Sequence, residues 1–228
     1  MATIPTYMTK KGVLTAGHGA IKTGVAASEI PFGALVTRAA DGTIQATVTG
    51  TKYDYLGIAV NDNRQQRPYD GFYAAGKKVP YVATGTANGL LLGGQTVDAG
   101  NFVKIAGTLG AGTEPLGVLV PEGTATTRTV ASVGRVVDVA DSGSADYDQS
   151  IASYVGDVVT FADAATKNKL ELVDGDYVVI DSNEYAEVNM VADADYSSTQ
   201  VKMVKDLLAG HATAPTMYKL TPIEVAFV

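Results

Sequence analysis

The sequence predicts a mainly β protein: an antiparallel β-barrel or sandwich domain with an extended N-terminal arm and an acidic, mostly β C-terminal region that carries one short helix. Two observations predict the strands. Of 228 residues 25 are glycine and only 18% are charged, a composition that favours strands and tight turns over charged helices. The apolar runs are short, rich in β-branched residues and separated by glycine, as in antiparallel barrels and sandwiches. Cysteine is absent, which excludes disulfides, but a chain of this length can bury a sufficient core without them.

Three segments follow one another along the chain. Residues 1–24 show little periodicity and many turn residues, so we expect an extended arm that becomes ordered on a partner. Residues 25–137 form the glycine-rich β domain, and residues 138–228 form an acidic, β-rich domain. The charge distribution supports this division, because residues 1–135 carry a net charge of +4 and the rest of the chain carries −11.

Five apolar runs predict strands in the glycine-rich domain, since a turn signal separates each run from the next. These runs are residues 34–36, 56–60, 79–82, 102–105 and 116–120. Pro80 lies inside the third run. Because proline cannot donate a hydrogen bond to a neighbouring strand, we expect it at a sheet edge or a bulge.

A short phrase occurs twice in this domain and predicts two related hairpins. Residues 30–36 and 97–103 each combine an apolar residue, a glycine and a valine at the same spacing, and each leads to a Leu-Gly pair, at Leu56-Gly57 and at Leu116-Gly117. We expect the first glycine of each copy to supply a positive-φ turn before a strand. The second glycine would permit a bulge or a close approach of two backbones.

The acidic domain contains four further apolar runs that predict strands: residues 157–161, 170–173, 177–180 and 224–228. Asp174-Gly175 separates the second run from the third, which indicates a hairpin. Residues 201, 204, 207 and 208 are apolar, and this spacing predicts a short amphipathic helix that ends at Gly210.

No motif in the sequence indicates catalysis, a cofactor or a metal site. The chain has two histidines, so a site built from several imidazoles is not available. Residues 174–176 and 193–195 match fragments of calcium loops but lack the later bidentate glutamate. His18 and His211 are expected to cap a turn or lie exposed. We therefore expect neither an enzyme nor a cofactor-binding protein.

Charge and hydropathy also limit the partners. The net charge of −7 argues against nucleic-acid binding, which requires Lys and Arg to displace counterions from phosphates. No apolar run reaches the roughly 20 residues of a membrane-spanning helix, and the N-terminus has no secretory signal pattern, so we expect a soluble protein made in a cytoplasm. Residues 64–69, Arg-Gln-Gln-Arg-Pro-Tyr, suit a wet protein interface, and a solvated loop is the alternative.

Part of the glycine-rich domain resembles the capsid decoration, or cement, proteins of tailed bacteriophages. In that family an apolar-Pro-x-Gly-x-x-Val entry leads to a Gly-Val-Ala-Leu-Asn-Asp-like strand and then to a Gly-x-x-Val-x-Val strand. The matching segments here are residues 30–36, 41–44, 56–62 and 76–82, followed by a second entry at 101–103. The resemblance covers about residues 25–137 and implies a small β protein, without catalytic residues, on the outside of an HK97-type shell.

The resemblance implies a virion protein that is produced in the host cytoplasm and cements neighbouring copies of the major capsid protein. We expect it to act as a homo-oligomer, a trimer or a dimer. The expected capsid-binding residues are Lys10, Lys11, Lys22, Arg64 and Arg67, while the acidic domain faces solvent and keeps particles apart. The alternatives are another phage structural subunit, in a tail tube or head fibre, and a carbohydrate-binding or adhesin domain. The absence of tryptophan counts against the last.

Overall fold

The computed structural model confirms the predicted fold class: the described chain is mainly β, with a closed five-stranded barrel, additional strands and one short helix, α2 (Ala164–Lys169). The residues that it describes are 17–47, 55–61, 72–92, 95, 97–106, 117–122, 129, 131–139, 148–181, 184–189, 197–208, 210–211 and 213–227.

Five strands close into a barrel, because each is hydrogen-bonded to the next and the last returns to the first. In order around the ring they are β7 (Lys78–Leu92), β9 (Leu119–Pro121), β8 (Phe102–Ile105), β10 (Gly134–Val139) and β16 (Thr216–Phe227). Only the β7–β9 pair in this ring is parallel. The interior is aliphatic and includes Val82, Leu91, Leu119, Val136, Ile223 and Val225.

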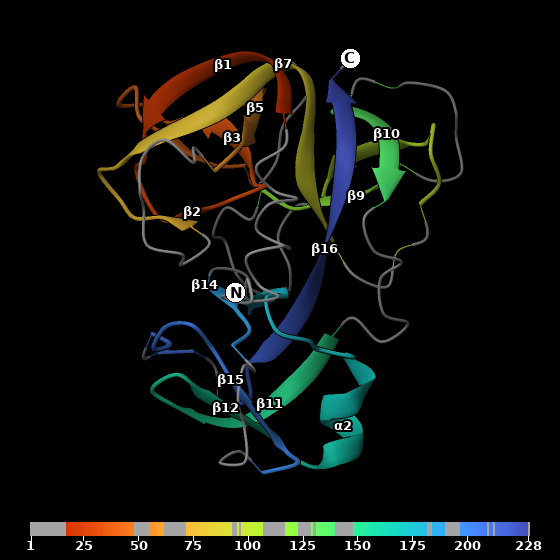
Figure 1. Cartoon of the computed structure of the whole chain (residues 1–228). Helices are drawn as coiled ribbons and strands as arrows, with labels where there is room; N and C mark the ends of the chain where they lie inside the picture. Colours follow the sequence, from red (N-terminus) through yellow and green to blue (C-terminus); the bar gives the residue numbers. More distant parts are fainter. Residues whose placement is uncertain are drawn as a thin grey trace, which may run out of the picture.

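The long strand β7 organises the rest of this part, which we call the barrel lobe (Figure 1). Along one side β7 pairs first with β1 (Gly17–Val25) and then with β9. Along the other it pairs first with β5 (Tyr55–Ala59) and then with β16. The sheet continues from β5 to β3 (Leu35–Arg38) and β4 (Ile44–Ala46), and a small separate sheet joins β2 (Ile30–Pro31) to β6 (Phe72–Tyr73).

A second part, the C-terminal lobe, has its own aliphatic and aromatic core, which includes Ile151, Phe161, Val178, Met203 and Met217. Its strands are β11 (Asp148–Val155), β12 (Val158–Phe161), β13 (Tyr177–Ile180), β14 (Glu184–Glu187), β15 (Gln200–Lys202) and the first half of β16. Figure 1 shows β16 running from this lobe into the barrel. A third apolar cluster, with Phe32, Tyr73 and Tyr177, contains residues of both lobes.

The strand predictions of the glycine-rich domain hold. The five predicted runs correspond to β3, β5, β7, β8 and β9. The two copies of the repeated phrase lead to related antiparallel pairings, of β3 with β5 and of β8 with β9. The first pairing is not a hairpin, because β4 lies between β3 and β5 in the chain and pairs with β3 itself. The first glycines of the two copies, Gly33 and Gly100, have φ of 82° and 94°, as their place before a strand requires.

The predicted arm at residues 1–24 needs correction over its last part. Residues 17–24 lie in strand β1, in register with β7. The glycines that suggest flexibility instead permit close pairing: a Cβ on Gly19 would lie 1.7 Å from the Thr84 carbonyl oxygen, so only glycine fits there. Residues 1–16, including Lys10 and Lys11, lie outside the described part of the chain.

The prediction of a helix over residues 201–208 is also wrong. Residues 200–202 form β15, paired with β12, and burial alternates because Val201 and Met203 are buried while Lys202 is partly exposed. The short helix is α2 instead. Its N-cap is Asp163, whose carboxylate accepts the Thr166 backbone N–H at 2.7 Å. This hydrogen bond holds the pKa of Asp163 below its ordinary value.

Two further expectations fail for local reasons. Residues 170–173 are not a strand, because Leu170 caps α2 and the chain then turns through residues 171–176 into β13. Pro80 lies between neighbours rather than at an edge, opposite Thr23 of β1, and its carbonyl accepts the Val60 N–H. The missing N–H of Pro80 is tolerated because β5 ends at Ala59, beside it.

Candidate functional site

The candidate interface is the outer edge of β1. Residues 19–23 of this strand are all exposed, and Ile21 retains 60% of its accessible surface. Within the described residues β1 pairs with β7 alone, and its other edge meets a neighbour only past its end, where Ala26 bridges to Ile44 of β4. A strand exposed on both faces and paired along one edge presents backbone donors and acceptors to another chain.

Local sequence positions this strand. Gly19 lets the backbone of β1 approach Thr84 closely, and Gly24 lies under Ile44, whose Cγ2 would be 2.7 Å from an added Cβ. Between Ala20 and Ile21 the register shifts by one residue, so that Ala83 of β7 is bulged. A bulge increases local twist. The edge of β1 is therefore curved, and its register with β7 is defined.

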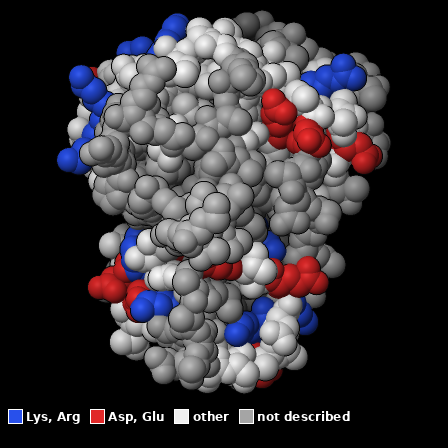
Figure 2. Space-filling view, in the orientation of Figure 1, with Lys and Arg blue, Asp and Glu red and all other residues white. Residues whose placement is uncertain are grey.

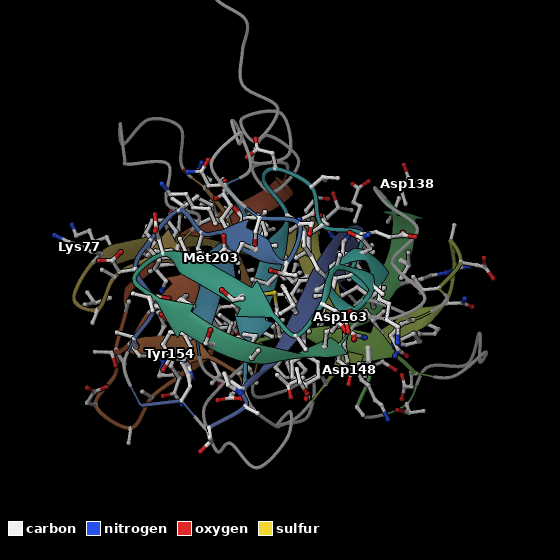
Figure 3. All side chains as sticks on the ribbon, turned by 90° about the horizontal axis from the view of Figure 1, so that it is seen from below. Lys77, Asp138, Asp148, Tyr154, Asp163 and Met203 are labelled. Carbon is white, nitrogen blue, oxygen red and sulfur yellow. The ribbon has the colours of Figure 1, made fainter. Side chains whose placement is uncertain are left out.

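The edge has a positive charge at one end. Lys22 is exposed on β1, and Lys77 and Lys78 are exposed at the beginning of β7, beside the end of β1. Figure 2 shows Lys and Arg side chains gathered at the upper left, over the end of the barrel lobe where Figure 1 places these strands. Figure 3 shows Lys77 projecting outwards at the tip of the ribbon. This charge suits an acidic partner surface.

A small hollow lies beside the bulge. Its volume is about 190 Å³, and it is bounded by β5, β7 and the end of β16; its lining is Tyr55, Leu56, Gly57, Ala83, Thr84, Gly85, Val133 and Phe227. Drug-sized ligands occupy pockets of roughly 300–1,000 Å³. The hollow is therefore smaller than the pockets that hold drug-sized ligands.

Of the predicted capsid-binding residues, the structure places Lys22, which lies on the exposed strand. Lys10, Lys11, Arg64 and Arg67 fall outside the described residues. The sequence analysis selected Lys22 but did not predict the strand on which it lies. The segment Gly17–Val25 has no alternation of apolar and polar residues, so its sequence carries no clear signal of a strand.

A second group of polar residues lies at the junction of the lobes, and we call Glu29, Asp181, Glu184, Lys205 and His211 the junction cluster. The ring of His211 is only 5% exposed. Its Nδ1 lies 3.1 Å from Oδ2 of Asp181, and its Nε2 lies 2.5 Å from Oε2 of Glu184. The ring also packs edge to face on Tyr154, with 5.6 Å between centroids.

Lys205 extends the junction cluster into the barrel lobe. Its Nζ lies 2.8 Å from Oε1 of Glu29, 3.6 Å from Oε1 of Glu184 and 4.4 Å from the centre of the Phe72 ring. Glu29 precedes β2 and Phe72 belongs to β6, so both contacts cross from one lobe to the other. Nearby, burial raises the pKa of Tyr185 well above its usual range, and the charge of Glu29 adds to this.

The sequence analysis missed the junction cluster. His211 was expected to cap a turn or lie exposed, but the structure buries it between two carboxylates. The members come from segments far apart in the chain, from Glu29 to His211, so no local spacing indicates them. In the described residues no group of three or more His, Cys, Asp or Glu side chains has the arrangement to hold a metal ion.

In the parts of the chain that the structure describes, no helix has the length and apolar character needed to cross a membrane. No protein-family model matches the chain, and no curated protein matches it.

Proposed function

We propose that this chain is a structural protein of a tailed-bacteriophage particle, which binds the outer surface of an HK97-type capsid and cements neighbouring copies of the major capsid protein. The observation that supports this most directly is the β1 edge: a nine-residue strand whose residues 19–23 are exposed and whose outer edge has no partner among the described residues. The resemblance of residues 25–137 to decoration proteins supports the same proposal.

Cementing depends on contact with several subunits rather than on chemistry. A strand edge binds an extended segment mainly through backbone hydrogen bonds. One such contact is small compared with a standard protein interface. An oligomer that places two or three of these edges on adjacent capsid subunits gains avidity, because the second contact forms within an already bound complex. Weak individual contacts are then sufficient to oppose separation of the subunits.

The charge distribution gives the proposal a polarity. Residues 1–135, which include Lys22 of β1 and the neighbouring Lys77 and Lys78, carry a net charge of +4, and the remainder carries −11. In the proposed orientation the β1 edge faces the shell and the C-terminal lobe faces solvent. An acidic outer surface would keep crowded particles apart.

The test is to mix the purified protein with matching expanded capsids that lack it, and to measure co-sedimentation and the temperature of shell rupture. We expect saturable binding and a higher rupture temperature. Absence of binding to the shell, together with assembly of the free protein into rings or binding to glycans, would refute the proposal in favour of a tube subunit or an adhesin.

Lys22→Glu should reduce capsid binding at least about tenfold, because it reverses the charge on the exposed strand. Lys104→Glu is the matched control: Lys104 is also an exposed lysine on a barrel strand, β8, and the charge change is the same. Affinities are measured by co-sedimentation at fixed salt. Equal losses for the two variants would show that the β1 edge is not the contact.

A truncation separates the arm from the strand. Removal of residues 2–16 leaves β1 complete, whereas removal of residues 1–22 would also delete most of the strand. Comparison of the shorter truncation with the full chain in the same binding assay therefore measures the contribution of residues 2–16, which include Lys10 and Lys11, apart from that of β1.

A further inference from the structure

We propose that the protein forms a dimer by strand exchange, in which β1 of each copy takes the place beside β7 of the other copy. The proposal names the element that joins two copies, and it does not depend on what the outer edge of β1 binds. It rests on how β1 is attached, on which strands the edge of β7 accepts and on where the chain enters the core.

Strand β1 is attached mainly through its backbone. All nine of its residues pair with β7, along the outside of the barrel lobe (Figure 1). Of residues 19–25, whose burial the structure describes, none is buried and none belongs to an apolar core. Burial of apolar side chains is the main favourable contribution that holds an element in a fold. The ladder with β7 is therefore the main attachment of β1 to its own copy.

The strand that β1 covers is fixed in place. Val79, Tyr81 and Val82 of β7 are buried, and the opposite edge of β7 pairs with β5 and β16. Removal of β1 would leave a row of unpaired N–H and C=O groups on a strand that the core holds in position. Such a row pairs readily with a strand of another chain. Strand β7 thus stays in its own copy, whereas β1 can be replaced.

Two close contacts determine which strand this edge accepts. An added Cβ on Gly19 would lie 1.7 Å from the Thr84 carbonyl oxygen, and one on Gly24 would lie 2.7 Å from Cγ2 of Ile44. An incoming strand therefore needs glycine at both places, in register with β7. The β1 strand of a second copy meets both conditions, because its sequence is the same. Exchange of an identical element between copies is a low-cost route to a dimer.

The chain enters the core directly after β1, at Ala26. Ala26 is buried, its N–H donates to the Lys77 carbonyl at 2.9 Å, and its carbonyl accepts the Gly76 N–H at 2.8 Å. The strand before it can change direction at Gly24, since glycine adopts backbone angles that are closed to other residues. The nine residues of β1 span roughly 30 Å when extended, which is enough to reach the β7 edge of an adjacent copy. Each copy then keeps its own core, and both β1–β7 ladders form between chains.

The first experiment uses disulfide cross-linking, for which a chain without cysteine is well suited. Ala20 and Thr84 are exposed and lie opposite each other in the β1–β7 ladder, at a separation that a disulfide can bridge. Ala20→Cys and Thr84→Cys are made in separate chains, which are mixed in urea, refolded together and oxidised. We expect a covalent dimer linked between positions 20 and 84, identified by mass spectrometry.

The matched control is a mixture of Ser153→Cys and Thr160→Cys chains. These residues also lie opposite each other, in the β11–β12 ladder, but only Gly156 and Asp157 separate the two strands. A strand pair with so short a connection forms within one copy. The 20–84 linkage should exceed the 153–160 linkage at least about tenfold. Equal amounts would refute strand exchange, because collisions between monomers would then explain both linkages.

The second experiment measures whether the β1–β7 ladder determines the oligomeric state. Gly19→Ala should raise the dissociation constant of the dimer at least about tenfold, because the added methyl group meets the backbone of β7 in the other copy. Gly42→Ala is the matched control and should leave the dimer unchanged, since nothing lies within 4 Å of its added Cβ.

Light scattering over a range of protein concentrations measures the dissociation constants. A parent chain that is monomeric throughout, or a dimer that Gly19→Ala leaves unchanged, would overturn the proposal. If Gly19→Ala does not fold, the cross-linking experiment decides. Neither experiment uses capsids, so its outcome is separate from that of the capsid-binding test.

Discussion

At Gly57 the backbones of β5 and β7 approach more closely than any side chain permits. A Cβ at this position would lie 2.0 Å from the Val82 carbonyl oxygen, and the residue has φ of 151°. The ladder between β3 and β5 has its register shift here, because Val36 pairs with Gly57 and Thr37 pairs with Tyr55. The glycine of the second Leu-Gly pair, Gly117, is similarly close to the backbone of Leu35. Both confirm the role predicted for these glycines.

Gly57→Ala should destabilise the protein by about 3 kcal/mol, because the added methyl group must displace the backbone of β7. Gly76→Ala is the matched control. Gly76 also has positive φ, +76°, but nothing lies within 4 Å of its added Cβ, so its cost should be about 1 kcal/mol, from conformation alone. Urea denaturation of the two variants measures the difference, and equal losses would contradict the backbone contact.

At the scale of elements, a buried ion pair shapes the connection between α2 and β13. Nζ of Lys219, on β16, lies 3.3 Å from Oδ2 of Asp176 and donates to the Glu171 carbonyl at 2.9 Å. Asp176 also accepts the Val173 N–H at 2.8 Å. Glu171 has φ of +46°, a conformation that non-glycine residues rarely adopt. The ion pair therefore holds a strained turn where the sequence pattern predicted a hairpin.

Lys219→Met should cost about 3–5 kcal/mol, because it leaves the Asp176 carboxylate buried without its cation. The side chains of Lys219 and Asp176 are only 6% and 4% exposed. The double variant Lys219→Met, Asp176→Asn should recover part of this loss, since it removes the buried charge as well. Chemical denaturation of both single variants and the double variant gives the coupling energy. Additive losses would mean that the two side chains do not interact.

At the scale of the whole molecule, β16 joins the lobes into one unit. Its first half pairs with β11 and β13 in the C-terminal lobe, and its second half pairs with β7 and β10 in the barrel. The predicted domain of residues 138–228 therefore supplies a strand to the barrel as well as forming its own core. Figure 1 shows this strand as the continuous connection between the two lobes.

Met217→Ala and Ile223→Ala should each destabilise one and the same unfolding transition by about 2–5 kcal/mol, the usual cost of truncating a buried aliphatic side chain. Both residues are fully buried on β16, Met217 in the core of the C-terminal lobe and Ile223 in the barrel core. Calorimetry should show a single transition that moves to lower temperature in both variants. Two transitions, with only one affected by each substitution, would show that the lobes unfold independently.

The sequence by itself determined the mainly β class, most strands of the barrel lobe and the relation between its two Leu-Gly segments. These features are encoded locally, because short β-branched runs and the glycines at Gly33 and Gly100 act within a few residues of their own position. The sequence also contained the signal for α2, an aspartate cap before Ala-Ala-Thr-Lys-Asn-Lys, although the stronger apolar spacing at 201–208 drew the prediction elsewhere.

Only the tertiary structure decided which strands are neighbours, and several features of this protein depend on that choice. Residues 201–203 are extended because this segment pairs with strand β12. Gly17–Val25 is a strand because it pairs with β7. The junction cluster has the same origin: Glu29, Lys205 and His211 are distant in sequence, and their contact is formed when β16 brings the two lobes together. Such contacts arise from long-range packing, for which a local pattern carries no signal.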